Sequence, residues 1–470
     1  MSEGVAFSAA RPSKPGGTAN AFLGVDLGTS GLKLALLGAD GSLVAEAEAG
    51  YEVRRPHAGW AETDPAEWVA TLRTARAALP PASIAAVGVT GQMHGAVLCD
   101  ESGVPVRPAV LWPDQRATAE LDRWGAIPAP ARDRLANPLA PGMTGPIVAW
   151  LAAHEPDAVA RATHLLLPKD FLRLTIAGPP VTERSDASAT LLWDVVGDDW
   201  SAAAVAAADI PARLLPEVVS PDTVVGSDGD AAVIAGCADT PAALLAVGTV
   251  DDFQINLGTG AQVLRRVAAP QPVASPVTHL YAAADEGWYA MAAVQNAGLA
   301  LDWVCGVLGF SWADLVEAAA AGPAGAGGVT FLPFLTGERG GLAGPSSRGG
   351  WLGLRASTTR LELARAAVEA MVFAVRRAAE LLGPLGPAVR LTGGGGREPL
   401  VRQLLADALG VVVRRVEVRS ASATGAALLA ARAVGANVLP DRACPPDTVP
   451  RPNPALESAY SSWLEHTRTA

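Results

Sequence analysis

The chain has little that would point to a metal cluster, a disulfide framework or a nucleic-acid surface. Its four cysteines are far apart and form no CxxC pair, which excludes a typical zinc site and a disulfide scaffold. Acidic residues outnumber basic ones, 47 against 36, and the net charge of −11 disfavours binding to a phosphate backbone. No apolar stretch is long enough to cross a bilayer. We therefore expect no nucleic-acid partner, no membrane contact and a cytoplasmic location.

Three common nucleotide-binding signatures are also missing. The sequence contains no P-loop motif, no protein-kinase motif set and no dinucleotide fingerprint placed after a strand. At 470 residues the chain is too long for one core, so we expect two large domains. Strand-like and helix-like stretches alternate, which predicts an α/β architecture. Residues 1–20 are rich in Pro, Gly and Ser and are expected to form a flexible tail.

What the chain does contain is a repeated strand–turn–strand pattern. The stretches "VDLGTSGLKL" (25–34) and "INLGTGAQVL" (255–264) each run from alternating apolar residues through Leu-Gly-Thr into a second such stretch. A second pair, "AVGVTGQMHG" (86–95) and "VRLTGGGGRE" (389–398), carries a strand into Thr-Gly. Two copies of one plan predict two similar lobes, although short Gly-Thr turns also recur by chance.

The second half of the chain carries clear helix signals. Thr359 and Glu362 form a capping box before a run of apolar residues at helical spacing that ends at Gly383. Pro399 and Gly410 bound the next expected helix. The stretch "SASATGAALLAARAVG" is rich in small residues, and it predicts a helix that packs closely against a neighbour.

The glycine-rich turns suit an anionic ligand, because successive backbone N–H groups form a concave anion site. Each lobe has one such turn, and hydroxyl side chains would add hydrogen bonds. A polyphosphate held from both sides would contact Gly28, Thr29, Ser30, Gly258 and Thr259.

Asp26 lies at the end of the first strand, where the second copy has Asn256. A carboxylate beside phosphates is costly unless a cation lies between them, and Mg²⁺ prefers oxygen ligands. We therefore expect Asp26 to hold Mg²⁺, directly or through water; the alternative is that Asp26 caps its own turn. In the four-glycine cluster, Gly394 and Gly395 would allow a base or ribose to lie against the main chain.

Nine separated stretches, taken together and in order, resemble the FGGY carbohydrate kinases, and among these most of all the xylulokinases. They fall within residues 21–436 and read "GVDLGTSGLK", "RPHAGWAETDPAEW", "GQMHGAVL", "LWPDQRA", "LLPKDFLRLTIAG", "SDASATLLWDV", "FLPFLTGER", "ELARAAVEAM" and "LTGGGGRE". The resemblance implies an α/β, two-lobed actin-like ATPase (ribonuclease H-like) fold with the active site in the interlobe cleft. It also implies ATP and Mg²⁺ as cofactors and a small-molecule sugar as substrate.

The resemblance further implies a division of the chain and a reaction. Residues 21–236 would form the N-terminal lobe on the sugar and metal side. Residues 237–436 would form the C-terminal lobe on the nucleotide side, and residues 437–470 a C-terminal extension. The implied reaction phosphorylates the terminal hydroxyl of a ketose, D-xylulose to D-xylulose 5-phosphate. By family analogy the chain would form a homodimer.

Site residues follow from the same resemblance. Asp239 matches the catalytic base, which orients the sugar hydroxyl and accepts its proton, and Asp26 is the second catalytic acid. The sugar-facing positions are Met93, His94, Trp112 and Asp114. Without the family context, Asp239 would be interpreted as a helix cap, and His94 as a loop histidine bonded to the backbone.

Several positions depart from the family pattern and leave the substrate open. Thr240 follows Asp239 where relatives commonly carry asparagine, and Pro113 replaces another asparagine. Gly340 and Gly341 stand in place of Thr-Pro, and Gly260 stands where serine is usual. The alternatives are a kinase for another ketose or a polyol, a catalytically idle sugar-sensing relative, and an actin- or chaperone-like ATPase.

Overall fold

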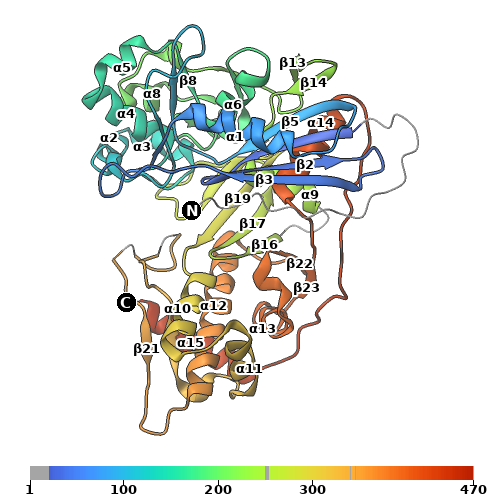
Figure 1. Ribbon diagram of the computed structural model, residues 1–470. Helices are drawn as coiled ribbons and strands as arrows, with labels where there is room; N and C mark the ends of the chain where they lie inside the picture. The colour runs from blue at the N-terminus through green and yellow to red at the C-terminus, as the bar shows by residue number, and fades with distance from the viewer. Residues whose placement is uncertain (1–20, 249–252, 339, 345, 469–470) are drawn as a thin grey trace.

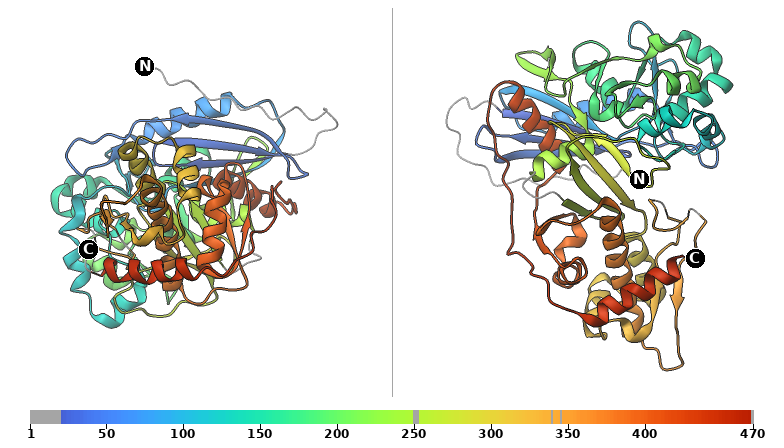
Figure 2. Two further views of the ribbon diagram at one scale, coloured as in Figure 1. Left: turned by 90° about the horizontal axis from the view of Figure 1, so that it is seen from below. Right: turned by 180° about the vertical axis from the view of Figure 1, so that it is seen from behind.

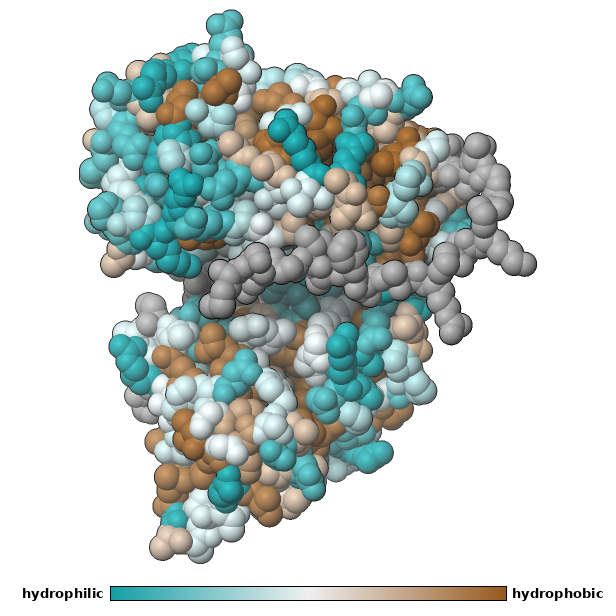
Figure 3. Space-filling view, viewed as in Figure 1, coloured by the Kyte–Doolittle hydropathy of each residue, from teal (hydrophilic) through white to brown (hydrophobic). Residues whose placement is uncertain are grey.

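The computed structural model describes residues 21–248, 253–338, 340–344 and 346–468, and the expected N-terminal tail lies outside the described residues. Figures 1 and 2 show two lobes, each built on its own sheet with helices packed against it. In the space-filling view of Figure 3, the outline narrows between the two lobes.

The first lobe contains a mixed sheet in the order β13-β14-β5-β1-β2-β3, with β15 also paired to β5. Its strands are β1 (Ala21–Leu27), β2 (Gly31–Leu37), β3 (Leu43–Gly50), β5 (Ile84–Gly91), β13 (Val224–Asp228), β14 (Ala231–Ile234) and β15 (Cys237–Ala238). Its helices are α1 (Pro65–Ala77), α2 (Leu121–Gly125), α3 (Ala129–Arg132), α4 (Thr144–His154), α5 (Pro156–Arg161), α6 (Pro168–Ile176), α7 (Arg184–Ala187), α8 (Ala202–Ala208) and α9 (Asp239–Val247). Four short strand pairs complete it: β4 (Glu62–Thr63) with β7 (Ala109–Val110), β6 (Val97–Cys99) with β8 (His164–Leu166), β9 (Val181–Glu183) with β12 (Glu217–Val219), and β10 (Trp193–Asp194) with β11 (Asp199–Trp200).

The second lobe contains a sheet in the order β18-β19-β17-β16-β22-β23. Its strands are β16 (Phe253–Leu257), β17 (Ala261–Val267), β18 (His279–Ala282), β19 (Trp288–Val294), β22 (Ala388–Thr392) and β23 (Val412–Arg415). Its helices are α10 (Gly298–Leu308), α11 (Trp312–Ala321), α12 (Arg360–Leu382), α13 (Pro399–Leu409) and α15 (Pro454–Thr467). The strands β20 (Thr330–Leu332) and β21 (Gly350–Leu352) form a separate hairpin.

The two sheets share one plan, as the sequence repeat predicts. The path β3-β2-β1-β5-β14 has the same strand directions as β19-β17-β16-β22-β23, with antiparallel pairs on one side and parallel pairs on the other. The register also agrees, because Asp26 lies opposite Thr90 and Asn256 lies opposite Thr392. The repeat therefore reflects two related lobes.

The small-residue stretch forms α14 (Ala421–Ala433), which lies across β1, β2 and β5 of the first sheet and packs against α9 (Figure 1). The contact is backbone to backbone. A Cβ atom at Gly24 would lie 1.7 Å from the Ala423 carbonyl oxygen, and one at Gly88 would lie 2.2 Å from that of Ala426. Only glycine on the strands allows this approach, so the predicted close packing is confirmed.

The expected boundary after residue 236 stays a prediction. In the structure β15 pairs with β5, and α9 packs against α14, so both elements that follow this boundary lie with the first sheet. The chain then forms the second lobe and returns to the first sheet in α14.

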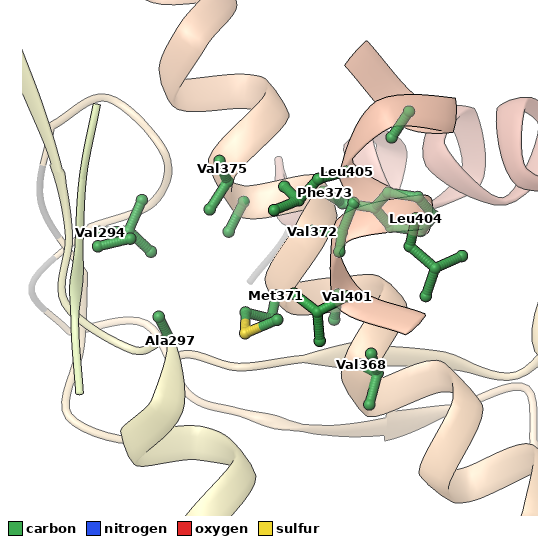
Figure 4. Packing of buried hydrophobic residues seen from close by; sticks show 14 of the residues in the cluster. Val294, Ala297, Val368, Met371, Val372, Phe373, Val375, Val401, Leu404 and Leu405 are labelled. Carbon is green, nitrogen blue, oxygen red and sulfur yellow. The ribbon is translucent and has the colours of Figure 1, made fainter. Parts of the chain in front are cut away.

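The core of the second lobe forms around α12, which begins at the Thr359 capping box and ends at Gly383 as predicted. Figure 4 shows Val368, Met371, Val372 and Val375 of α12 near α13 and the strand that carries Val294. The C-terminal segment adds α15 to this core, and its Trp463 is 1% exposed.

No single helix in the described part of the chain is long and apolar enough to span a bilayer. The helices α10 and α11 pass such a test only as a pair, and this pair is bent by 89°.

Candidate active site

Asp26 and Asp239 lie at the carboxyl ends of parallel strands in the middle of the first sheet. β1 and β15 lie on opposite sides of β5 at this end, and all three strands run parallel there, with Asp26 opposite Thr90 and Cys237 opposite the same threonine. Asp239 comes two residues after Cys237, at the first residue of α9. Neighbouring strands lie about 4.8 Å apart, so β1 and β15 lie about 10 Å apart on either side of β5. The negative charge of Asp239 acts on Asp26 across this distance.

Both carboxyl groups are held in a partly dehydrated environment. Burial, reinforced by the negative charge of Asp239, raises the pKa of Asp26 from 3.8 to about 7. Burial also raises the pKa of Asp239 to about 6, although hydrogen bonds from Thr240 act in the opposite direction. Two carboxyl groups with pKa values near neutrality suit proton transfer and cation binding.

Thr240 orients the carboxylate of Asp239. Its backbone N–H and its hydroxyl both donate to Asp239 Oδ1, at 2.6 and 3.2 Å. Within the described residues no hydrogen bond to Asp239 Oδ2 is found. The threonine that departs from the family pattern therefore supplies a contact of its own to the carboxylate.

The donor set around Asp26 fits a magnesium ion shared with a ligand. Asp26 Oδ1 is buried and has no hydrogen-bond partner. The described residues contain no group of three or more His, Cys, Asp or Glu side chains that could hold a metal ion. Mg²⁺ commonly takes one or two carboxylates and completes its shell with water and substrate phosphates. Asp26 therefore has the chemistry of such a ligand, and water and substrate phosphates would supply the remaining ligands.

The first glycine-rich turn joins β1 to β2 and is tied to two neighbouring side chains. The Tyr51 hydroxyl donates to the carbonyl of Gly28, and Gln92 Nε2 donates to the same carbonyl at 3.4 Å. Trp112 Nε1 donates to Thr29 Oγ1 at 2.8 Å. The turn residue Ser30 is exposed. The structure thus brings Trp112, expected on the sugar side, to the expected phosphate turn.

Met93 and His94 follow β5 beside this turn. Met93 is 8% exposed, and the Tyr289 hydroxyl of β19 lies 3.8 Å from its sulfur. His94 has a φ of 66° and its Nδ1 lies 2.5 Å from the carbonyl oxygen of Ala189. Since a carbonyl oxygen only accepts, Nδ1 carries the proton in this contact. The backbone bond expected of a loop histidine is present, and it also sets the tautomer.

Asp114 does not lie open to a sugar in this structure, in contrast to the expectation. It is 0% exposed, and its oxygens accept hydrogen bonds from the Ala61 N–H at 2.6 Å and from Arg116 Nε and Nη2 at 2.9 and 2.8 Å. Arg116 in turn lies over the Trp60 ring, 3.6 Å from its centroid. A buried bidentate ion pair of this kind makes Asp114 a structural partner of Arg116.

The second glycine-rich turn joins β16 to β17 and is hydrogen-bonded to the start of α10. The carbonyl oxygens of Gly258 and Thr259 accept hydrogen bonds from the N–H groups of Gly298 and Leu299, at 3.1 and 2.9 Å. A Cβ atom at Gly298 would lie 2.6 Å from the Gly258 oxygen. Gly258 and Thr259 themselves are exposed, as a turn that meets a ligand must be.

The four-glycine cluster lies beside this turn. A Cβ atom at Gly393 would lie 2.3 Å from the Leu257 carbonyl oxygen, and one at Gly395 would lie 2.7 Å from the Leu257 side chain. At Gly394, in contrast, a Cβ atom would meet no other atom within 4 Å. The cluster and the second turn therefore form one continuous, partly side-chain-free surface with open space at Gly394.

The predicted residues thus fall into two groups. The first lobe brings together Asp26, Asp239, the first turn, Trp112, Met93 and His94. The second lobe brings together Gly258, Thr259, Gly394 and Gly395. The two glycine-rich turns belong to different sheets, one between β1 and β2 and the other between β16 and β17. The site is therefore divided between the lobes.

Sequence reasoning missed two residues at this site. Gln92 lies within the quoted stretch "GQMHGAVL", which was a usable signal. Tyr289 is 0% exposed and comes from the other lobe, in a strand with no distinguishing motif, so no local signal could have found it.

Comparison with known proteins gives this geometry a family. The N-terminal domain model of the FGGY family of carbohydrate kinases matches residues 21–245, and its C-terminal domain model matches residues 253–434. The xylulose kinase of Escherichia coli K12 is 33% identical over 432 residues, which cover 87% of this chain and 89% of that protein. The glycerol kinase of Alkalilimnicola ehrlichii is also 33% identical, over 89% of this chain and 91% of its own.

A solved structure agrees over nearly the whole chain. The crystal structure of a xyloylose kinase from Brucella ovis has a TM-score of 0.87 at 32% identity and covers 96% of this chain and 98% of its own. The two related sheets have the two-lobed actin-like architecture of these kinases. The chain therefore belongs to the FGGY family of carbohydrate kinases and is a xylulokinase-like carbohydrate kinase.

Proposed function

We propose that this sugar kinase transfers the terminal phosphoryl group of ATP to the terminal hydroxyl of D-xylulose, forming D-xylulose 5-phosphate. The observation that carries the proposal is the pair Asp26 and Asp239, two part-buried carboxyl groups on either side of the carboxyl end of β5, where the charge of Asp239 raises the pKa of Asp26. The choice of sugar rests on the relatives, whose names are those of xylulose kinases.

Asp239 acts as the base in this proposal. Above its pKa of about 6 the carboxylate accepts the proton of the sugar hydroxyl as the oxygen attacks the phosphorus. Thr240 holds Oδ1, so the proton is taken by Oδ2. Burial keeps bulk water away from this carboxylate, which limits transfer of the phosphoryl group to water.

Residues of both lobes would contact the nucleotide. Gly28, Thr29 and Ser30 would meet the phosphates from the first lobe, and Gly258 and Thr259 from the second. Gly394 and Gly395 would lie along the nucleoside. Closure of the lobes around one nucleotide would bring both turns to its phosphates.

Asp26 would hold the magnesium ion, directly or through water. When bound, the ion neutralises charge on the phosphate oxygens as the phosphoryl group transfers. The buried oxygen Oδ1, which has no protein partner, is the atom that supports this role. Since Asp26 has a pKa of about 7, protons compete with the metal below neutral pH.

The sugar would lie against Met93, His94 and Trp112. Asp114 takes a supporting part, because Arg116 and the Ala61 N–H occupy its oxygens. His94 presents a ring whose tautomer is set by Ala189. A homodimer and a cytoplasmic location remain predictions from family analogy and composition.

A polyol such as glycerol is the second candidate substrate. The observation in its favour is the glycerol kinase that is 33% identical over most of both chains. A coupled assay of ADP release separates the candidates when it is run with D-xylulose, other ketoses, gluconate and glycerol in turn. Sugar-dependent ADP that is fastest with D-xylulose supports the proposal. Faster turnover of another acceptor, or none at all, contradicts it.

The variant Asp239→Asn tests the base. It should abolish turnover, by roughly 10²–10⁴-fold or more, while ATP binding measured by calorimetry stays nearly unchanged. The matched control is Asp100→Asn, which changes a carboxylate in a turn of the same lobe, outside the site. Normal turnover by Asp239→Asn would refute the assignment.

A further inference from the structure

One segment of the first lobe contacts both His94 and the residue before Asp239, and it lies outside the predicted site residues. We call residues 183–189 the junction segment; it contains α7 and the sequence "ERSDASA". Ser185 Oγ accepts a hydrogen bond from the Ala238 N–H at 2.9 Å, one residue before Asp239. The Ala189 carbonyl oxygen lies 2.5 Å from His94 Nδ1. The segment is therefore bonded to the backbone of the base and to the sugar-side histidine.

The same segment is bonded to the second lobe. Ser188 Oγ accepts a hydrogen bond from the Ala282 N–H of β18 at 2.9 Å. Asn137 reinforces this contact, because its side chain exchanges hydrogen bonds of 3.0 Å in both directions with the backbone of Leu280. β18 is an edge strand of the second sheet, so its free N–H groups are satisfied across the lobe boundary.

A buried charged group holds the junction segment in place. Lys169 Nζ lies 2.6 Å from Asp170, 3.3 Å from Asp186 and 3.6 Å from Glu183, and all four side chains are 0% exposed. Glu183 also accepts hydrogen bonds from the Ser185 hydroxyl and N–H, each at 2.7 Å. Among the described residues, Asp170 Oδ2 and Asp186 Oδ1 have no hydrogen-bond partner, and burial raises the pKa of Glu183 and Asp186, so one ammonium group is shared among three carboxyl groups and ties the segment to α6.

Lys169 is also hydrogen-bonded to the backbone just before β15, the short strand that leads to Asp239. Lys169 Nζ donates to the Ala235 carbonyl at 3.5 Å, and Ser185 accepts from Ala238, so both ends of residues 235–238 are bonded to this group. β15 itself has only two residues and pairs with a single strand. Its position therefore depends on these side-chain contacts as well as on its own sheet hydrogen bonds.

We propose that the junction segment is a positioning element that aligns Asp239 and His94 with each other and with the second lobe, and that Ser185 is the residue through which it positions the base. The Ser185 hydroxyl accepts a hydrogen bond from the Ala238 N–H and donates one to Glu183 Oε1, so it links the residue before the base to the buried charges. The proposal rests on the proposed role of Asp239, and its test has a second readout that does not need turnover.

The variant Ser185→Ala removes this link while leaving the buried charges paired. A base displaced by about 1 Å costs up to about 10²-fold, so kcat with D-xylulose should fall roughly 10- to 100-fold, and the KM for the sugar should change less than about threefold. The matched control is Thr190→Val. Thr190 is equally buried, but its hydroxyl donates to Ala187 and accepts from the Leu192 N–H, away from the base. Its kcat should stay within about twofold of the wild type.

Hydrogen exchange supplies the readout that is independent of activity. The amides of residues 235–242 should exchange faster in Ser185→Ala than in Thr190→Val, because only the first variant removes the acceptor of the Ala238 N–H. If the wild type turns over no acceptor, the proposed function fails, and this exchange difference still decides the positioning role.

A double-mutant cycle tests whether the segment acts as one element. Ser188→Ala removes the acceptor of the Ala282 N–H of β18 and also the hydrogen bond from the Ser188 hydroxyl to the Ser185 carbonyl, and it should lower kcat by several-fold. The double variant with Ser185→Ala should lose less than the product of the two single losses. Equal losses of kcat in Ser185→Ala and Thr190→Val, equal exchange, or strictly multiplicative losses would each overturn the proposal.

Discussion

Replacing Asp26 with asparagine should stabilise the protein at neutral pH while removing its metal-dependent activity. The folded protein raises the pKa of Asp26 from 3.8 to about 7. A group with a raised pKa contributes stability below its unfolded pKa and loses it as the pH rises through the folded pKa. The ionised carboxylate of Asp26 therefore destabilises the folded state progressively between about pH 4 and pH 7, and asparagine avoids this cost.

The size of the effect follows from the shift. About three pKa units correspond to roughly 4 kcal/mol as an upper bound. Asp26 is only part-buried, and solvent screening reduces this figure to roughly 1–3 kcal/mol above pH 7. Each kcal/mol moves the midpoint of a lobe of this size by about 2–4 °C. The gain should be smallest near pH 4 and constant above pH 7.

The assay is denaturant and thermal unfolding of Asp26→Asn and the wild type at several pH values from 4 to 8. Glu101→Gln, which changes an exposed acid of the same lobe, is the control. With saturating Mg²⁺ and ADP the order should reverse, because the ligand stabilises only the protein that binds it. A variant that is less stable than the wild type at pH 8 in the absence of ligand, or a gain that does not depend on pH, would refute the reasoning.

Three other changes have defined outcomes. The kcat/KM of the wild type should rise with pH through about 6, as Asp239 loses its proton, and a flat profile from pH 5 to 8 would count against the base. Gly394→Ala should raise the KM for ATP without a loss of melting temperature, because its Cβ would meet no other protein atom within 4 Å. The control is Gly306→Ala in α10, where a Cβ also meets open space; it should leave the KM for ATP unchanged and add about 1 kcal/mol of helix stability. Trp463→Ala should destabilise the second lobe by about 3–5 kcal/mol in unfolding experiments, because the buried indole also donates to the Phe331 carbonyl; an unchanged midpoint would exclude α15 from that core.

Local patterns in the sequence were enough to predict many elements of the fold. The β1–turn–β2 pair, the capping box of α12 and the bounds of α13 follow from apolar spacing, hydroxyl caps and glycine or proline at element ends. These features depend on residues close together in the chain, so their physics can be evaluated from short stretches. The repeat of a strand–turn–strand plan even predicted two lobes with matching sheets.

Other features depend on contacts between distant residues, and no short stretch contains them. Asp114 was expected to face a sugar, but the position of Arg116 and the Ala61 N–H makes it a buried ion-pair partner. The C-terminal segment had no clear role in the sequence, and its Trp463 became part of the second core because folding brings it against Phe373 of α12.

The amino-acid sequence alone specified the local elements, the repeat and the residue types of a phosphate- and metal-binding site, because these are set by propensity and spacing. Tertiary structure alone decided that Asp26 and Asp239 share one edge, since β5 must pair between β1 and β15 to bring them together. It also decided that Ser185 supports the base, because the Ala238 N–H needs an acceptor that only the folded chain provides.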